Sequence, residues 1–337
     1  MKFKLPLLIV FYIFSINQLF AQTLPHTFSA NSAAKAEEVN ENFQFLANQF
    51  KVNKKTIDCT SDNMTKAIED GYNHLVINGT CTENLLITQF IKSFDGLYSS
   101  FDLTSNKPVN SLTLEGGTLG VWDNTNAGFQ ASLIYGGVLN IINLKVSQPL
   151  YLNNGARLFV NNSSLENVSS SDGSSAEINN SNLTCSNSND CVRGEDSGTL
   201  KLDNVTITNS GSSYTLALAR SSSAEIKNSN INNTNTDSDS KPTIGVQSNS
   251  SLQLEDTNVT SNNNEVSVNT NGYLLLTGGS IKRTNGSPTI RVRGPGIFHN
   301  YNSPTFADIT CDGKLSSFQN DDGTSTSVTN SNGADCQ

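Results

Sequence analysis

The stretch Ala176-Glu-Ile-Asn-Asn-Ser-Asn-Leu183 recurs almost unchanged as Ala224-Glu-Ile-Lys-Asn-Ser-Asn-Ile231, with the related Leu200-Lys-Leu-Asp-Asn-Val-Thr-Ile207 between the two. In each copy two apolar residues lie two apart, a turn residue follows, and another apolar residue comes five positions after the second. Residues two apart lie on the same face of a strand. Each copy therefore predicts a strand, a sharp bend and a second strand.

The same template extends along the chain in both directions, and the residue two positions after the second apolar residue defines the bend. It is always Gly, Asn or Asp, the types that tolerate the left-handed backbone conformation. In chain order these residues are Gly79, Gly96, Gly116, Asn143, Asn162, Asn180, Asn204, Asn228, Asp256, Gly278 and Asn300. A repeat of roughly 22 residues leaves room for a third strand, so the pattern predicts a solenoid in which each coil pairs with its neighbours.

This repeat resembles the right-handed parallel β-helices of the pectin-lyase-like superfamily, of the exported bacterial type. The resemblance covers residues 55–310. It includes Leu75-Val-Ile-Asn-Gly-Thr-Cys-Thr-Glu-Asn-Leu-Leu-Ile87, which is similar to a first coil, and a stacked structural corner formed by Asn143, Asn162, Asn180, Asn204 and Asn228. It implies an all-β fold, a right-handed parallel β-helix (solenoid) of about eleven coils with a short N-terminal helix. It implies no single function, because the superfamily holds lyases, hydrolases, esterases, adhesins and phage tailspikes.

The composition agrees with a turn-rich β protein. Of 337 residues, 15% are charged and 35% hydrophobic, and the chain contains 46 Asn and 44 Ser. These two types compete with helical backbone hydrogen bonds through their own side chains and favour turns. The formal net charge of −9 repels polyanions, which argues against nucleic-acid binding and against attraction to anionic membranes.

The segments outside the repeat give the expected domain organisation. Residues 1–21 predict a cleaved export signal, and no later segment is apolar enough for a membrane span, so a secreted, periplasmic or cell-surface location is expected. Residues 22–54 form an N-terminal segment with a helix at 33–50. That helix has heptad spacing but spans barely two heptads, so packing on the solenoid is favoured, with self-association as the alternative. Residues 55–310 form the parallel β-helix and residues 311–337 a C-terminal cap or tail.

Six cysteines follow the export signal, which suits an oxidising compartment. Their local bracketing along the chain favours three disulfides out of the fifteen possible pairings. The expected pairs are Cys59 with Cys81, Cys185 with Cys191 and Cys311 with Cys336. The chain lacks CxxC pairs and has only three scattered histidines, so a zinc site is not expected.

A solenoid needs caps, because an open coil exposes its core and its strand edges. The segment 61–70 begins with a helix start signal and carries apolar Met64, Ala67 and Ile68. We expect a short helix here that lies across the first coil and is held by the first disulfide.

Catalytic β-helices carry their reactive groups on outward strand positions and adjoining loops. The outward residues between the paired apolar residues are Thr113, Asn140, Phe159, Glu177, Lys201, Glu225, Gln253 and Leu275. Glu177 and Glu225 would lie two coils apart, roughly 9.6 Å, near the carboxylate separation of inverting glycosidases. Because Lys201 lies between them, a solvated ion-pair ladder is the favoured interpretation.

The one basic cluster contains Arg283, Arg291 and Arg293, which could bind a uronate carboxylate or supply a lyase base. The motifs of polygalacturonases and pectate lyases are missing from the sequence. No catalytic residue is therefore assigned, and Arg291, Arg293, Glu177 and Glu225 remain the candidates.

Four residues are candidates for ligand binding. Asp190, Glu195 and Asp196 crowd the loop between Cys185 and Cys191 and could bind Ca²⁺, although an EF-hand signature is absent. Trp122 lies in a polar stretch and could present its ring to a sugar. Ca²⁺ is thus the one cofactor considered, and a polysaccharide or cell-surface glycan is the expected partner.

The sequence favours an exported, non-catalytic protein for surface adhesion or glycan binding. The alternatives are a polysaccharide lyase or glycoside hydrolase acting on acidic polysaccharide, and a purely structural surface or matrix protein. The missing catalytic motifs favour the first function over the second. Ligand contact is expected on the loops that lengthen the coils, at 185–191 and 232–243.

Overall fold

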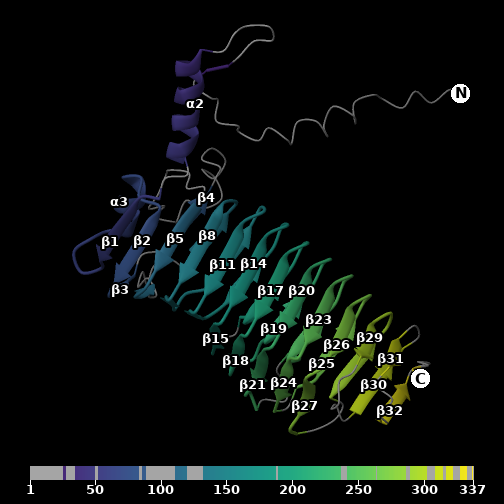
Figure 1. Cartoon of the computed structure of the whole chain (residues 1–337). Helices are drawn as coiled ribbons and strands as arrows, with labels where there is room; N and C mark the ends of the chain where they lie inside the picture. Colours follow the sequence, from purple (N-terminus) through teal and green to yellow (C-terminus); the bar gives the residue numbers. More distant parts are fainter. Residues whose placement is uncertain are drawn as a thin grey trace, which may run out of the picture. The chain divides into compact units, whose positions relative to one another are not determined.

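The computed structural model describes residues 26–27, 35–49, 52–82, 86–88, 111–119, 132–186, 189–236, 241–262, 264–285, 289–301, 308–313, 316–321, 327–331 and 336. The expected export signal and Trp122 lie outside these described residues, as does Gly96. The chain divides into two compact units, Met1–Val52 and Asn53–Gln337. The second unit is the solenoid (Figure 1).

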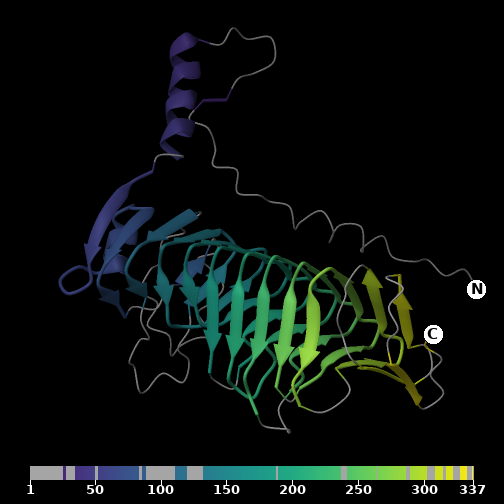
Figure 2. The same ribbon diagram turned by 60° about the horizontal axis from the view of Figure 1, so that its bottom comes forward.

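Three parallel sheets run along the second unit, and each strand pairs with the equivalent strand of the next coil (Figures 1 and 2). Sheet A contains β1 (Lys54–Asp58), β2 (His74–Asn78), β5 (Ser111–Glu115), β8 (Val138–Ile142), β11 (Arg157–Asn161), β14 (Ser175–Asn179), β17 (Thr199–Asp203), β20 (Ser223–Lys227), β23 (Ser251–Glu255), β26 (Tyr273–Thr277), β29 (Ile297–Tyr301) and β31 (Ser317–Asn320). Sheet B contains β3 (Thr80–Cys81), β6 (Thr118–Leu119), β9 (Lys145–Val146), β12 (Ser164–Leu165), β15 (Asn182–Cys185), β18 (Thr206–Asn209), β21 (Asn230–Asn233), β24 (Asn258–Ser261) and β27 (Ser280–Arg283). Sheet C contains β4 (Leu86–Thr88), β7 (Ser132–Tyr135), β10 (Leu150–Asn153), β13 (Val168–Ser170), β16 (Val192–Gly194), β19 (Leu216–Leu218), β22 (Ile244–Val246), β25 (Val266–Asn269), β28 (Ile290–Arg293), β30 (Asp308–Asp312) and β32 (Ser327–Ser331). The predicted all-β parallel solenoid is confirmed.

The repeat template sets the register of sheet A. Ala176 pairs with Leu200 and Ile178 with Leu202, and all four side chains are at most 2% exposed. A register shift of one residue would turn these apolar side chains toward solvent, because successive strand residues point to opposite faces. Alternate residues of each strand therefore point inward, and together they form a continuous apolar column along the solenoid.

The number of coils is smaller than the eleven predicted. Nine coils, from β2–β4 to β26–β28, have a described strand on all three sides. The last two coils, β29–β30 and β31–β32, have strands only in sheets A and C among the described residues. The prediction counted a coil at Gly96, which lies outside the described residues, and the partial coil that begins at β29, while it assigned β31 and β32 to the C-terminal tail.

The N-terminal end of the solenoid carries the expected short helix, α3 (Met64–Glu69). The Asn63 side chain caps it by accepting a 2.7 Å hydrogen bond from the Lys66 backbone N–H, which satisfies one of the free donors of the first turn. Met64, Ala67 and Ile68 are buried in the core. The helix therefore adds its apolar face to the end of the apolar column.

All three predicted disulfides are present: Cys59–Cys81, Cys185–Cys191 and Cys311–Cys336. The first bridge lies just after β1 and the third joins β30 to Cys336, after β32, so they lie at the two ends of the solenoid. A cross-link there limits the opening of the terminal coils.

The predicted asparagine corner between sheets A and B is also present. Its five asparagines adopt positive φ values of 48° to 54°, and Gly79, Gly116, Asp256 and Gly278 are left-handed as well. Side-chain amides link neighbouring coils along the corner: Asn162 Nδ2 donates to Asn143 Oδ1 at 2.6 Å, and Asn204 Nδ2 donates to Asn180 Oδ1 at 2.9 Å. Asn180 and Asn228 donate instead to Asn161 Oδ1 and Asp203 Oδ1, one residue before the corner of the neighbouring coil. The bend and the ladder of amides explain why Asn recurs at this position.

Asn300 was expected at this corner, and that prediction is wrong. Phe298 pairs with Leu274 and Asn300 with Leu276, so both lie two positions earlier in the template than expected. Asn300 is a fully buried strand residue whose Nδ2 donates to Asn320 Oδ1 at 2.7 Å. The shift brings Phe298 into stacking contact with Phe318, with ring centroids 5.2 Å apart.

A second left-handed corner, which the sequence analysis missed, joins sheet C to sheet A. Here two successive residues have positive φ, as in Asp196 with Ser197, Ser248 with Asn249 and Gly136 with Gly137. Each pair bends the chain just before the next strand of sheet A. The pair recurs before each sheet A strand from β8 to β26, whereas before β29 only Gly294 has a positive φ.

The first unit contains α2 (Ala36–Gln49), at the place expected for the N-terminal helix. Asn42 joins this helix to His26 through two hydrogen bonds, from His26 N to Asn42 Oδ1 at 2.9 Å and from Asn42 Nδ2 to His26 O at 2.8 Å. Self-association through residues 33–50 stays a prediction.

Candidate functional site

The outward face of sheet A carries the predicted column of outward-pointing residues in register. Thr113, Asn140, Phe159 and Glu177 occupy equivalent positions on four successive strands. The column continues on later strands through Lys201, Glu225, Gln253 and Leu275. The pairing register therefore brings together all eight side chains that the sequence predicted for this face.

An open groove of about 590 Å³ lies on this face over β5, β8, β11, β14 and β17. The Phe159 ring is 37% exposed and lines the groove. The polar lining includes Asn140, Asn161, Asn179 and Glu177. An accessible ring among amides and carboxylates can stack on a sugar while its neighbours hydrogen-bond the hydroxyl groups.

The candidate acid pair on sheet A lies in a charged ladder. Glu177 and Glu225 both pair with Lys201, so they are two strand spacings apart, as expected. Lys227 donates a hydrogen bond to Glu225, and this bond holds the pKa of Glu225 below its ordinary value. A general acid needs a raised pKa, so the environment of Glu225 is unsuited to protonating a leaving group.

Asp190 and Glu195 belong to an ion-pair network with Arg193. The Arg193 guanidinium contacts Asp190 Oδ2 at 3.0 Å and Glu195 Oε1 at 2.7 Å. Arg220 pairs with Glu195 and also with Asp196, at 2.8 Å. Burial alone would raise the pKa of Glu195, but the hydrogen bonds and charges of the two arginines outweigh burial and lower it.

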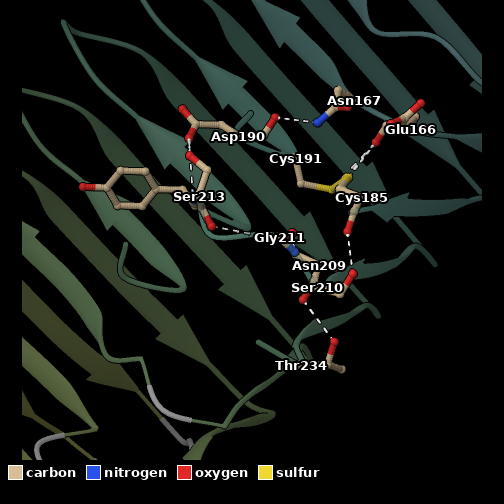
Figure 3. The surroundings of a disulfide bond; sticks show 11 residues. Glu166, Asn167, Cys185, Asp190, Cys191, Asn209, Ser210, Gly211, Ser213 and Thr234 are labelled. Atoms are coloured by element: carbon tan, nitrogen blue, oxygen red, sulfur yellow. Dashed lines mark hydrogen bonds between the residues drawn. A yellow bond between two sulfur atoms is a disulfide. The ribbon is translucent and has the colours of Figure 1, made fainter. Parts of the chain in front are cut away.

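Figure 3 shows Asp190, which lies in the loop closed by the Cys185–Cys191 disulfide, and the residues outside that loop that hold it in place. The Asn167 amide donates to the Asp190 carbonyl oxygen at 2.8 Å, and the Ser213 hydroxyl donates to the Asp190 carboxylate. The acidic residues expected to bind Ca²⁺ thus have protein partners. Within the described ranges, no group of three or more His, Cys, Asp or Glu side chains is arranged to hold a metal ion.

The arginine cluster lies where sheet B turns into sheet C. Glu265 Oε1 lies 3.2 Å from Arg291 Nε and 3.3 Å from an Arg293 guanidinium nitrogen, and Glu265 Oε2 lies 3.9 Å from Arg283. Arg293 also pairs in register with Asp312 of the next coil. The pairing of Arg293 with Asp312 is one of backbone register, so the cluster is built around the single Glu265 carboxylate, which joins neighbouring coils.

The sequence did not predict Arg193 and Arg220 as partners of these acidic residues. They belong to successive coils, and their contacts with Glu195 depend on the loops after β16 and β19 rather than on the strand repeat. No motif marks such pairs in the sequence. None of the helices in the described part of the chain is long and apolar enough to cross a membrane.

No protein-family model, curated protein or solved structure matches this chain. The functional conclusion therefore rests on the fold and the surface of the molecule.

Proposed function

We propose that this protein is an exported, non-catalytic β-solenoid that binds glycans through the outward face of sheet A, in surface adhesion or in capture of a polysaccharide. The observation that carries the proposal is the Phe159 ring, which is accessible in an open groove lined by amide, carboxylate and hydroxyl side chains. The groove is shallow and spreads over several coils, which suits a ligand that is itself extended.

The physical basis is the chemistry of a sugar ring. One face of a pyranose carries C–H groups that pack on an aromatic ring, and its edge carries hydroxyl groups that need donors and acceptors. Asn140 and Glu177 flank Phe159 on the neighbouring strands and supply both kinds of hydrogen-bonding group. The sheet fixes the spacing of these groups before ligand arrives, which lowers the entropy lost on binding.

Export is part of the proposal, as is membership of the pectin-lyase-like superfamily. Three disulfides support export, since they persist in oxidising compartments. The left-handed asparagine corner with its linked amides supports the superfamily. A non-catalytic role is supported by the lowered pKa of Glu225, which disfavours a glycosidase acid at that position.

The proposal is tested by a glycan array probed with the wild-type protein and with Phe159→Ala. Tyr301→Ala is the matched control, because Tyr301 is a 48% exposed aromatic residue on sheet A that does not line the groove. We expect Phe159→Ala to lose binding to glycans that the wild type and the control retain. Absence of wild-type binding to any glycan would reject the proposal in favour of a structural role, and release of reducing sugars or unsaturated uronates would reject it in favour of an enzyme.

A further inference from the structure

A second groove on sheet A continues the first. It measures about 410 Å³ and lies over β17, β20, β23 and β26. The two grooves share no residue, and they meet where Glu177 of the first pairs in register with Lys201 of the second. On β17 the first groove includes Asp203 at the end of the strand, and the second includes Thr199 at its start. Together the two grooves line eight successive strands of sheet A, from β5 to β26, which is seven strand spacings or about 34 Å.

Each groove contains an aromatic side chain, and the two rings lie far apart along the solenoid. Phe159 belongs to β11 and lines the first groove, while Tyr273 belongs to β26 and lines the second. Five strand spacings separate β11 from β26, or about 24 Å along the solenoid axis. A ligand that touches both rings must therefore be long and must run across the strands.

The spacing of the coils limits the kind of chain that fits. Adjacent strands of sheet A are about 4.8 Å apart, similar to the length that one sugar adds to an extended β-1,4-linked polysaccharide. Successive sugars of such a chain would meet successive coils. Tyr273 lies two residues before Leu275, the register equivalent of Phe159, so a chain that touches both rings crosses the coils obliquely, with an offset of about 7 Å along the strands. A ligand of about six sugars would reach from Phe159 to Tyr273, whereas three sugars would reach only one of them.

The charge of the two grooves limits the ligand further. Their charged lining residues are Glu177, Asp203 and Glu225, which are acidic, and Lys201, which is basic. The whole chain carries a net charge of −9. A polymer with a carboxylate on every sugar would be repelled along this surface, because like charges across an interface oppose association.

We propose that the two grooves form one binding trough for a neutral, unbranched, β-1,4-linked polysaccharide that runs along the solenoid axis with about one sugar per coil. The inference rests on the proposed glycan-binding function and names its ligand class. It departs from the acidic polysaccharide that the enzymatic alternative would require.

The test is calorimetric titration with neutral β-1,4-linked glucose oligosaccharides of three and six sugars, with polygalacturonate as the acidic comparison. We expect the hexasaccharide to bind at least tenfold more tightly than the trisaccharide. Phe159→Ala and Tyr273→Ala should each weaken hexasaccharide binding about tenfold, while Tyr301→Ala should leave it unchanged. Thermal unfolding of each variant checks that the fold is retained.

Equal affinity for the short and long oligosaccharides, or tighter binding of polygalacturonate, would overturn the inference while leaving glycan binding itself intact. Loss of hexasaccharide affinity in Phe159→Ala but not in Tyr273→Ala would also overturn it, because the second groove would then take no part. If the array and the titration both show no glycan binding at all, the result contradicts both this inference and the proposed function.

Discussion

The asparagine corner makes a quantitative prediction for the substitution Asn204→Leu. Asn204 has a φ of +54°, and its Nδ2 donates a 2.9 Å hydrogen bond to Asn180 Oδ1. A branched apolar side chain disfavours the left-handed conformation by about 1–2 kcal/mol. Loss of the amide hydrogen bond removes about 0.5–1 kcal/mol more. We therefore expect the free energy of unfolding to fall by about 1.5–3 kcal/mol.

Two further variants separate these contributions in urea denaturation followed by circular dichroism. Asn204→Gly keeps the left-handed bend available and removes only the amide, so it should lose about 1 kcal/mol or less. Asn182→Leu places the same new side chain at an exposed position of strand β15 that has no positive φ. If Asn204→Leu and Asn182→Leu have the same denaturation midpoint, the corner does not contribute as argued.

Three other predictions address the ends, the close packing of coils and the ion-pair network. The pKa of Glu195 lies below its ordinary value of 4.5, so its pairing stabilises the fold above about pH 4.5, and this contribution is lost as the pH falls through the folded-state pKa. Glu195→Gln should lower the urea midpoint at about pH 7, and its difference from the wild type should shrink as the pH falls below about 4.5. Gly279→Ala should destabilise by about 2–4 kcal/mol in the same assay, because φ is +72° and the new Cβ would lie 2.1 Å from the Thr257 carbonyl oxygen, whereas the control Gly173→Ala should lower the free energy of unfolding by only about 1 kcal/mol. Gly173 has a φ of +71°, and a Cβ added there would have no atom within 4 Å. Cys311→Ser should speed hydrogen exchange in β30 and β32 and leave β14 to β20 unchanged, because each coil contacts only its neighbours; uniform acceleration along the solenoid would contradict this.

The sheet A strand and its corner were predictable because two independent constraints coincide there. Apolar residues two apart identify the strand, and a single left-handed residue restricts the following bend to Gly, Asn or Asp. Near Asn300 the two constraints separate, because Phe298 and Asn300 match the template while the chain continues as a strand. A residue type that permits a bend does not require one.

The second corner had no such signal. Its paired left-handed residues include Arg220 with Ser221 and Thr270 with Asn271, as well as Gly136 with Gly137, so no narrow set of residue types marks it. Backbone hydrogen bonds between coils hold it instead, as where Ser221 N donates to Ser248 O at 2.9 Å. Tertiary pairing here overrides the local preference against positive φ.

Part of the candidate site could likewise be predicted from the sequence, and part could not. The outward column on sheet A could be predicted because strand alternation and register place it once the repeat is known. The ion pairs of Arg193 and Arg220 could not, because they depend on the path of loops that no repeat fixes. The continuity of the two grooves likewise depends on how side chains of different size lie across eight coils.

Hydroxyl-radical footprinting of the protein with and without a bound oligosaccharide tests the central claim most directly, since it reports the accessibility of individual rings in the intact molecule. Phe159 and Tyr301 are 37% and 48% exposed on the same sheet, so each is open to oxidation in the free protein. If glycans bind in the sheet A groove, the oxidation rate of Phe159 will fall several-fold on addition of the oligosaccharide, while that of Tyr301 stays constant. An unchanged rate at Phe159 under saturating ligand, or equal protection of both residues, would contradict the proposed site.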